Sequence, residues 1–169
     1  GGDTWASTYL DVLRTLNELG SYAAITNGVI FHNTLASSDY GFLAPRTFLP
    51  RPNYFAVLLW NRLMGTPVYD CAALNRENTH VYCHSRRDGA PGVVYLILNN
   101  SLTEVRTVTL PKDALRYTLH AEALRSPTIQ LNGTALSLSD TGALPALEPV
   151  PQARGTVPLA PGSCTFLVL

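Results

Sequence analysis

The apolar residues of this chain follow one period up to residue 65 and a different one after residue 67. Residues 4–19 and 52–64 repeat apolar side chains at helical spacing, and Pro52 stands where a helix commonly begins. From residue 67 onward, short apolar runs alternate with Gly, Pro, Asn and Asp, a pattern typical of antiparallel strands. This change of period predicts an α+β chain in two parts, with a helical part over residues 1–66 and a β-sandwich over residues 67–169.

Residues 22–31 lie between the two helices and are apolar and rich in β-forming residues, which predicts a strand buried on both faces. Gly20 stands where a helix commonly ends. Helix, strand, polar loop and helix are the parts of a βα barrel, in which loops after the strands carry the site. Two helices cannot cover both faces of one strand, so we expect this part to be a fragment that needs another polypeptide.

The β part contains several segments with the length and alternation of strands. Val93 to Leu98 is apolar at every position, which predicts a central strand with Val94, Leu96 and Leu98 on one face. Asn132-Gly133 is a strong signal for a two-residue hairpin. Residues 141–162 carry five prolines and are predicted to form an extended crossover on the surface. The predicted strands are residues 79–85, 93–98, 105–110, 115–120, 128–131, 134–138 and 164–169.

Composition argues against several classes of function. The net charge is zero, so no overall field draws the chain to nucleic acid or to an anionic membrane, and no run is long enough for a membrane span. The three cysteines are too few for a disulfide framework and are interpreted as small apolar residues. They lack zinc-site spacing with the histidines, and no glycine-rich phosphate loop occurs, so we expect neither a metal nor a cofactor.

No complete catalytic set is visible. A hydrolase that uses two carboxyl groups needs them a few ångströms apart in one cleft. The five glutamates fall on a helix exterior or in predicted turns and strand ends, where a solvated surface charge is the favoured interpretation. They are Glu18, Glu77, Glu104, Glu122 and Glu148.

The loop over residues 32–41 is the best candidate site. Asn33, Asp39 and Tyr40 offer an amide, a carboxylate and a phenol at the end of the predicted strand, where sugar hydroxyls could be bound. The alternative is an ordinary loop that uses Asn and Asp in turns. His32 at the strand edge is interpreted as a structural histidine.

Three motifs in this region resemble the heparanase and β-glucuronidase family of retaining glycoside hydrolases. They are His32-Asn33-Thr34-Leu35-Ala36-Ser37-Ser38-Asp39-Tyr40-Gly41, Thr47-Phe48-Leu49-Pro50-Arg51-Pro52-Asn53-Tyr54 and Leu58-Leu59-Trp60-Asn61-Arg62-Leu63-Met64-Gly65. The family pairs a (β/α)8 barrel with a C-terminal β-sandwich. The resemblance therefore implies that residues 1–66 are the last helix, strand and helix of such a barrel, and that residues 67–169 are the sandwich.

The resemblance also implies what the chain does. The family's two catalytic glutamates would precede Gly1, so the chain would be inactive alone and its partner would be the upstream barrel of the same, secreted enzyme. The substrate would be a uronic-acid glycan or a glucuronide. Asn33, Ser38, Asp39, Tyr40 and Gly41 would contact that substrate, with Tyr40 against the uronic acid.

Two positions depart from the family pattern: Ser38 replaces a common glycine whose backbone approaches the sugar carboxylate, and His32 replaces an arginine of some members. We expect the main task of residues 68–169 to be to brace the barrel. One other interpretation stays open, in which the β part is a non-catalytic carbohydrate-binding or interaction module.

Overall fold

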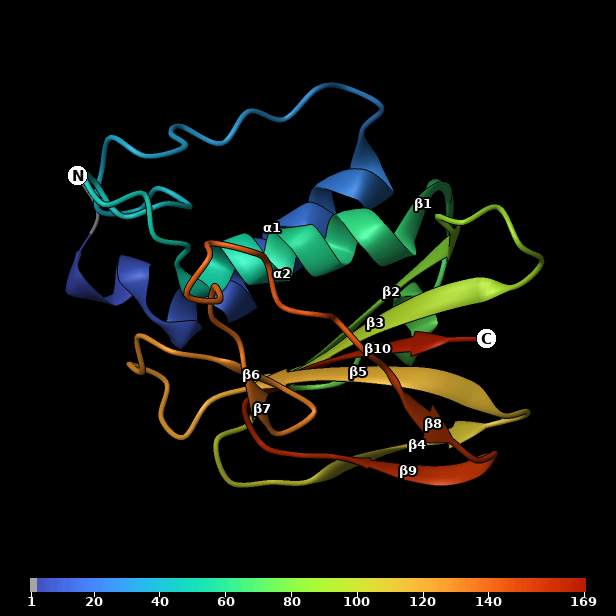
Figure 1. Cartoon of the computed structure of the whole chain (residues 1–169). Helices are drawn as coiled ribbons and strands as arrows, with labels where there is room; N and C mark the ends of the chain where they lie inside the picture. The colour runs from blue at the N-terminus through green and yellow to red at the C-terminus, as the bar shows by residue number, and fades with distance from the viewer. Residues whose placement is uncertain (1–2) are drawn as a thin grey trace.

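The computed structural model describes residues 3–169 and contains two α-helices, two short 3₁₀ helices and ten strands (Figure 1). The helical elements are η1 (Thr4–Ser7), α1 (Tyr9–Ile25), α2 (Pro52–Leu63) and η2 (Ala72–Leu74). The strands are β1 (Met64–Tyr69), β2 (Thr79–Arg86), β3 (Val93–Asn99), β4 (Arg106–Leu110), β5 (Ala114–His120), β6 (Gln130–Leu131), β7 (Thr134–Ala135), β8 (Val150–Gln152), β9 (Gly155–Leu159) and β10 (Ser163–Val168).

Eight of the strands form one sheet in the order β1-β2-β3-β10-β5-β6-β7, with β8 paired to β5 beside that path. Every pair in the sheet is antiparallel. Strands β4 and β9 form a separate two-stranded ribbon. Figure 1 shows α1 and α2 over one face of the main sheet and the ribbon across the other face. The predicted combination of helices with an antiparallel sheet is confirmed.

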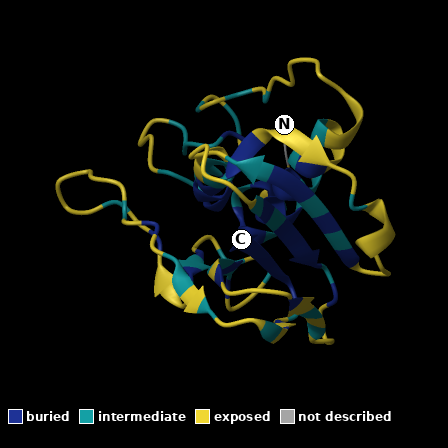
Figure 2. Ribbon diagram, turned by 90° about the vertical axis from the view of Figure 1, so that its right-hand side faces the viewer, coloured by how far each residue is buried: buried dark blue, intermediate teal, exposed yellow. Residues whose placement is uncertain are grey.

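The main sheet is apolar on both faces and so separates two hydrophobic cores. Val94, Leu96 and Leu98 of β3 pack in the core on the helix side, together with residues of α1 and α2. Ile97 packs in the second core with the ribbon, and Val93 and Tyr95 lie against it. The alternation predicted for β3 is confirmed, and Figure 2 shows the buried strands at the centre of the molecule.

Two polar contacts hold α1 in place on the sheet and beside α2. The hydroxyl of Tyr9 lies 2.9 Å from the carbonyl oxygen of Leu119 and 2.7 Å from that of Gly162. The carboxylate of Asp11 is fully buried, and it accepts hydrogen bonds from the Arg14 Nε (2.6 Å) and the Asn53 Nδ2 (2.8 Å). Because a buried charge is tolerated only when it is paired, this cluster determines how the two helices meet.

The strand predicted over residues 22–31 is wrong for this chain. Helix α1 continues through Gly20 to Ile25, and residues 26–31 belong to no strand. A central strand needs neighbours that accept and donate its backbone hydrogen bonds, and the described part of the chain offers none there. Gly20 does not end the helix either: a Cβ at this position would collide with the Tyr82 ring, so glycine allows α1 to approach β2 closely.

The proline-rich segment over residues 141–162 is more than the surface crossover that was predicted. It contains β8 and β9, and Val157 and Leu159 of β9 are buried in the second core. Pro158 sits between them on the exposed side of the strand. Proline is tolerated here because β9 pairs only with β4.

Strand β1 crosses the expected boundary between residues 66 and 67. It follows α2 without a break and pairs with β2. Its first residue, Met64, packs in the same core as α1, α2 and the main sheet. The division into residues 1–66 and 67–169 stays a prediction, and the two parts share this core.

The three cysteines are free, and two of them lie in strands as small buried residues. Burial raises the pKa of Cys164 to about 12. Cys71 is half-buried just after β1, and its thiol donates to the Val81 carbonyl at 3.1 Å. The interpretation of the cysteines as small apolar residues therefore holds for Cys83 and Cys164.

Replacing Leu96 by Ala is expected to lower the free energy of unfolding by about 2–5 kcal/mol, because Leu96 is fully buried and the change leaves a cavity. Urea unfolding followed by circular dichroism measures this loss. The matched control is Leu115→Ala, since Leu115 is 41 % exposed and should change the free energy by only about 0.5 kcal/mol. Equal losses for both variants would contradict the assignment of Leu96 to the core.

His84 is expected to make the stability of the fold depend on pH. Burial lowers the pKa of His84, although its Nδ1 donates to the Gly65 carbonyl at 2.7 Å, and its Nε2 is buried without a partner in residues 3–169. The unfolded chain therefore binds a proton to His84 at a higher pH than the folded chain does. Stability should fall as the pH drops from about 7 toward the folded pKa.

The measurement is the melting temperature between pH 5 and pH 8. His84→Asn should flatten this dependence, whereas His80→Asn, at a half-exposed position of the same strand, should leave it unchanged. A slope that is the same in all three proteins would show that another group is responsible.

Candidate functional site

The segment between α1 and α2, residues 26–51, runs over the outer side of the two helices (Figure 1). It contains no strand, and its backbone is held by a few hydrogen bonds. The Leu43 amide donates to the Leu35 carbonyl at 2.8 Å, and the Ala44 amide donates to the Leu49 carbonyl at 2.9 Å. An isolated bridge joins Leu43 to Pro50. The segment is therefore a folded loop whose two ends are fixed by the helices.

Arg51 holds one turn of this loop. Its Nη1 lies 2.9 Å from the Ser38 carbonyl oxygen, 2.6 Å from that of Asp39 and 3.2 Å from that of Gly41. Arg51 directly precedes Pro52, the first residue of α2. The guanidinium thus connects the turn over residues 38–41 to the rigid start of a helix, and three carbonyl groups converge on one charged donor.

His32 supports the same turn from the other side. Its Nε2 lies 3.0 Å from the carbonyl oxygen of Tyr40, to which it can donate. Its ring stacks on Phe42 with the ring centroids 4.1 Å apart, and it meets the Tyr40 ring in a T-shaped arrangement with the centroids 6.4 Å apart. The structural role predicted for His32 agrees with these contacts.

The structure brings four of the five predicted residues together. Ser38, Asp39, Tyr40 and Gly41 form one turn, closed by the Gly41 amide, which donates to the Ser38 carbonyl at 3.2 Å. Asn33 lies outside this turn, exposed on the loop that leads to it. Asp39 is exposed and Tyr40 is half-buried.

Two features of the turn distinguish it from an ordinary surface loop. The Ser38 hydroxyl is buried and has no hydrogen-bond partner within residues 3–169. Gly41 is buried, and a Cβ there would lie 3.0 Å from the Leu35 carbonyl oxygen, so a larger residue would require the loop to shift by a few tenths of an ångström.

An apolar hollow of about 430 Å³ lies between α1 and this loop. Its walls include Leu19 and Tyr22 of α1 and Phe31 and Leu35 of the loop, and none of the five predicted residues lines it. Several large apolar side chains at the end of α1 and along the loop are more than half exposed: Ile25, Val29, Ile30, Phe31, Leu35, Phe48 and Leu49. Exposed apolar side chains in this number often contact another protein segment.

Arg51 is the residue of this site that the sequence interpretation missed. The signal that could have found it is its position immediately before Pro52, because a helix start is a rigid point from which a long side chain can reach back to the preceding loop. The described residues contain no group of three or more His, Cys, Asp or Glu side chains that could hold a metal ion. Within the same residues, neither helix is long and apolar enough to cross a membrane.

No family model matches the chain, but individual proteins do. All of it aligns with baicalin-β-D-glucuronidase of Scutellaria baicalensis, at 30 % identity and over 33 % of that protein. It also aligns in full with heparanase-like protein 1 of Arabidopsis thaliana, at 29 % identity and over 38 % of its length. Inactive heparanase-2 of Homo sapiens matches at 28 % identity over the whole chain and 33 % of the relative.

Solved structures share the fold at lower identity. A 4-O-α-L-rhamnosyl-β-D-glucuronidase from Fusarium oxysporum superposes with a TM-score of 0.71 and 14 % identity, over the whole chain and 41 % of the enzyme. A GH51 arabinofuranosidase from Xanthomonas axonopodis pv. citri gives a TM-score of 0.61 at 15 % identity, over 96 % of the chain and 36 % of the enzyme. At such identities the likeness concerns the fold alone.

The chain spans about a third of the length of the curated relatives it matches. This partial coverage agrees with the sequence motifs, which implied that the chain is one portion of an enzyme. Similarity over the whole length of the chain thus confirms its resemblance to one portion of proteins of the heparanase and β-glucuronidase family.

Proposed function

We propose that the chain is the C-terminal part of a retaining glycoside hydrolase that acts on uronic-acid glycans or glucuronides. The observation that carries this proposal is the alignment of the whole chain with a glucuronidase and with heparanase-like proteins. The fold likeness to a rhamnosyl-glucuronidase supports it. By the same relationship we expect the complete protein to be secreted.

In this proposal the two parts of the chain have different tasks. Residues 1–66 complete a (β/α)8 barrel whose other strands and helices come from the rest of the protein. The exposed apolar side chains of residues 25–49 support this, because they offer a surface for that barrel to cover. Residues 67–169 brace the barrel through the core they share with α1 and α2.

The chain itself holds no catalytic pair in this proposal. All five of its glutamates are exposed, and Glu18 and Glu104 form ion pairs with Arg14 and Arg106. A general acid of this class instead needs an environment that raises its pKa, and the two carboxyl groups must flank one bond. The acid and the nucleophile are therefore assigned to the rest of the protein.

The purified chain is expected to release no measurable 4-nitrophenol from 4-nitrophenyl β-D-glucuronide, because neither carboxylate is present. The complete protein should hydrolyse this substrate with retention of configuration, which proton NMR of the first product detects. Turnover by the chain alone would contradict the assignment of both glutamates to the missing part. An inverted first product would contradict the retaining mechanism.

The turn over residues 38–41 forms part of the subsite for the uronic acid. Tyr40 provides an apolar ring and a hydroxyl, and Ser38 provides a buried hydroxyl that has no partner within residues 3–169. Asp39 and Asn33 are exposed on the same loop and extend the subsite. Gly41 lets the turn close, and Arg51 holds its carbonyl groups in place.

In the complete protein, Tyr40→Phe is expected to reduce kcat/KM on a glucuronide by about 10-fold or more, since a hydrogen bond to a charged group contributes about 1.5–3 kcal/mol. Activity on the corresponding neutral glucoside, which lacks the carboxylate, should fall much less. The melting temperature should hardly change. Equal losses on both substrates, or a large drop in melting temperature, would assign Tyr40 a structural role.

A second candidate is a non-catalytic protein of the same family that binds acidic glycans without cleaving them. The observation that favours it is the similarity to inactive heparanase-2, which at 28 % identity equals the similarity to a heparanase of Gallus gallus. The assay of the complete protein separates the two candidates. Binding of a uronic-acid oligosaccharide without turnover would support the second.

A further inference from the structure

Two of the three cysteines lie on the same face of the main sheet, and the third lies on the other face. Side chains alternate along a strand, so Cys83 of β2 faces the same side as Val81, which packs in the second core. Cys71 also packs against that core. Cys164 of β10 instead belongs to the core on the helix side. The main sheet therefore separates Cys164 from the other two, and Cys71 with Cys83 is the one pair of these three that shares a face.

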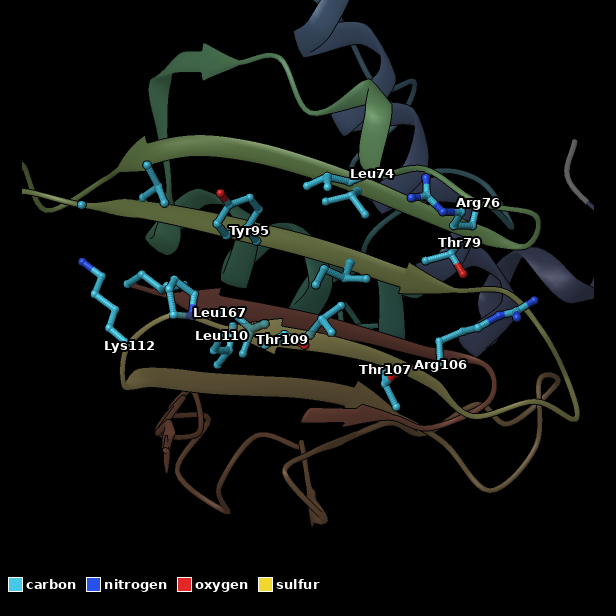
Figure 3. Close-up of a pocket in the computed structure, with 17 residues that line it drawn as sticks. Leu74, Arg76, Thr79, Tyr95, Arg106, Thr107, Thr109, Leu110, Lys112 and Leu167 are labelled. Atoms are coloured by element: carbon cyan, nitrogen blue, oxygen red, sulfur yellow. The ribbon is translucent and has the colours of Figure 1, made fainter. Parts of the chain in front are cut away.

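The neighbours of the two cysteines show the same arrangement. Tyr95 of β3 is the direct partner of Cys83 in the sheet, and Leu74 of η2 follows Cys71 after one turn of chain. Figure 3 shows the side chains of Tyr95 and Leu74 on the side of the main sheet that faces the ribbon. Both line a hollow of about 640 Å³ between the sheet and β4. The segment that carries Cys71 therefore folds over the same face that Cys83 occupies.

The thiol of Cys71 lies against the edge of β2, close to Cys83. The Cys71 Sγ donates to the Val81 carbonyl oxygen at a distance of 3.1 Å. Tyr69, which precedes Cys71 on the same segment, is the direct partner of Cys83 in the register of β1 and β2. Cys71 thus stands diagonally opposite Cys83, just beyond the end of β1, and its sulfur contacts the part of β2 from which Cys83 projects.

The electrostatics of Cys71 agree with this proximity. Burial, followed by the nearby Cys83 thiol, raises the pKa of Cys71 to about 11, while a hydrogen bond with the Cys83 backbone acts in the opposite direction. Burial also raises the pKa of Cys83. Both thiols are therefore protonated at neutral pH, which slows their reaction with outside reagents. A raised pKa does not prevent the two from pairing when an oxidant and time are supplied.

The two sulfurs can meet after a small movement. A disulfide joins residues whose Cα atoms lie about 4.4–6.8 Å apart, and diagonal residues on neighbouring strands lie about 7–8 Å apart. Cys71 is not fixed in a ladder, because β1 ends at Tyr69. A thiol is a weak hydrogen-bond donor, so releasing Cys71 from the Val81 carbonyl costs little. A shift of about 1 Å at the end of β1 is thus enough to allow the bond.

We propose that Cys71 and Cys83 are a cross-linking site, at which a disulfide forms when the protein passes through an oxidising compartment. The two thiols lose their protons and together two electrons, and the disulfide of the oxidant takes up both and is reduced to two thiols. The new S–S bond closes a ring of residues 71–83. This ring contains η2 and the exposed residues 72–78, so the bond anchors that segment to β2.

The proposal rests on the proposed function only through the expectation that the complete protein is secreted. The test supplies the oxidant and does not measure hydrolysis, so its failure and the failure of the proposed function are distinguishable. It uses the complete protein, incubated with oxidised glutathione at about pH 8.5 to increase the fraction of thiolate. Remaining thiols are then blocked with iodoacetamide in guanidinium chloride, without reduction, and the protein is digested with trypsin.

The sequence makes the products easy to distinguish. Arg76 is the only Lys or Arg between the two cysteines, so trypsin places Cys71 in peptide 63–76 and Cys83 in peptide 77–86. We expect mass spectrometry to detect these two peptides joined, at a mass lower than their sum by two hydrogen atoms. Cys164, in the peptide that begins at Gly155, should be alkylated.

Three variants serve as controls. Cys71→Ser and Cys83→Ser should each abolish the joined product, and Cys164→Ser should leave it unchanged. The oxidised protein should also melt at a higher temperature than the reduced protein, because the ring restricts the unfolded chain. In Cys71→Ser, oxidant and reductant should give the same melting temperature.

Four outcomes would overturn the proposal. Alkylation of both Cys71 and Cys83, or glutathione on Cys71 with Cys83 alkylated, would show that the two sulfurs do not reach each other. Either peptide joined to the one that carries Cys164, or to another part of the longer protein, would give a different pairing. Equal melting temperatures of the oxidised and reduced protein, with the joined product present, would contradict the anchoring of residues 72–78.

Discussion

The fold depends on the burial of β10 between β3 and β5. Every residue of this strand is buried, and it pairs along its whole length with both neighbours. Phe166 and Val168 face the helices, while Leu167 faces the ribbon, so the strand contributes to both cores. Loss of β10 would separate β1, β2 and β3 from the rest of the sheet, because it is their only connection to β5 in the strand order.

The sheet that β10 completes gives α1 and α2 a rigid base, and the helices in turn support the candidate site. Tyr9 connects α1 to the sheet, and Asp11 connects α1 to Asn53 near the start of α2. Arg51 stands one residue before α2 and holds the turn over residues 38–41. A loop with few backbone hydrogen bonds of its own thus receives a defined shape from a contiguous series of packed elements.

The two faces of the molecule are incomplete in different ways. On the helix side, the loop over residues 26–51 exposes large apolar side chains that nothing in residues 3–169 covers. On the other side, β4 pairs with β9 alone within the described residues, so its second edge has no strand partner there. The chain spans about a third of its relatives' length, and both surfaces are the kind that the remainder of a larger protein would complete.

Local patterns in the sequence were enough to predict most of the β part. Alternation assigned the two faces of β3, the final strand was recognised from its apolar run, and Asn132-Gly133 forms the hairpin turn between β6 and β7 with positive φ at both residues. Each of these depends on side-chain period or on the backbone preference of one or two residues. The family resemblance likewise rested on short motifs that can be recognised without a structure, and the similarity to known proteins confirmed this resemblance.

Tertiary structure decided the features that depend on which other segments a stretch of chain packs against or pairs with. Residues 22–31 have the composition of a strand, yet six of them lie outside any regular element because no strand is beside them. Val157 and Leu159 became core residues in a proline-rich segment because β4 was available to pair with β9. The sequence by itself therefore determined the spacing of the apolar residues, the turns and the family resemblance. Only packing decided which segment pairs with each strand edge and what Arg51 does. Hydrogen bonds and burial between distant segments leave no local pattern in the sequence.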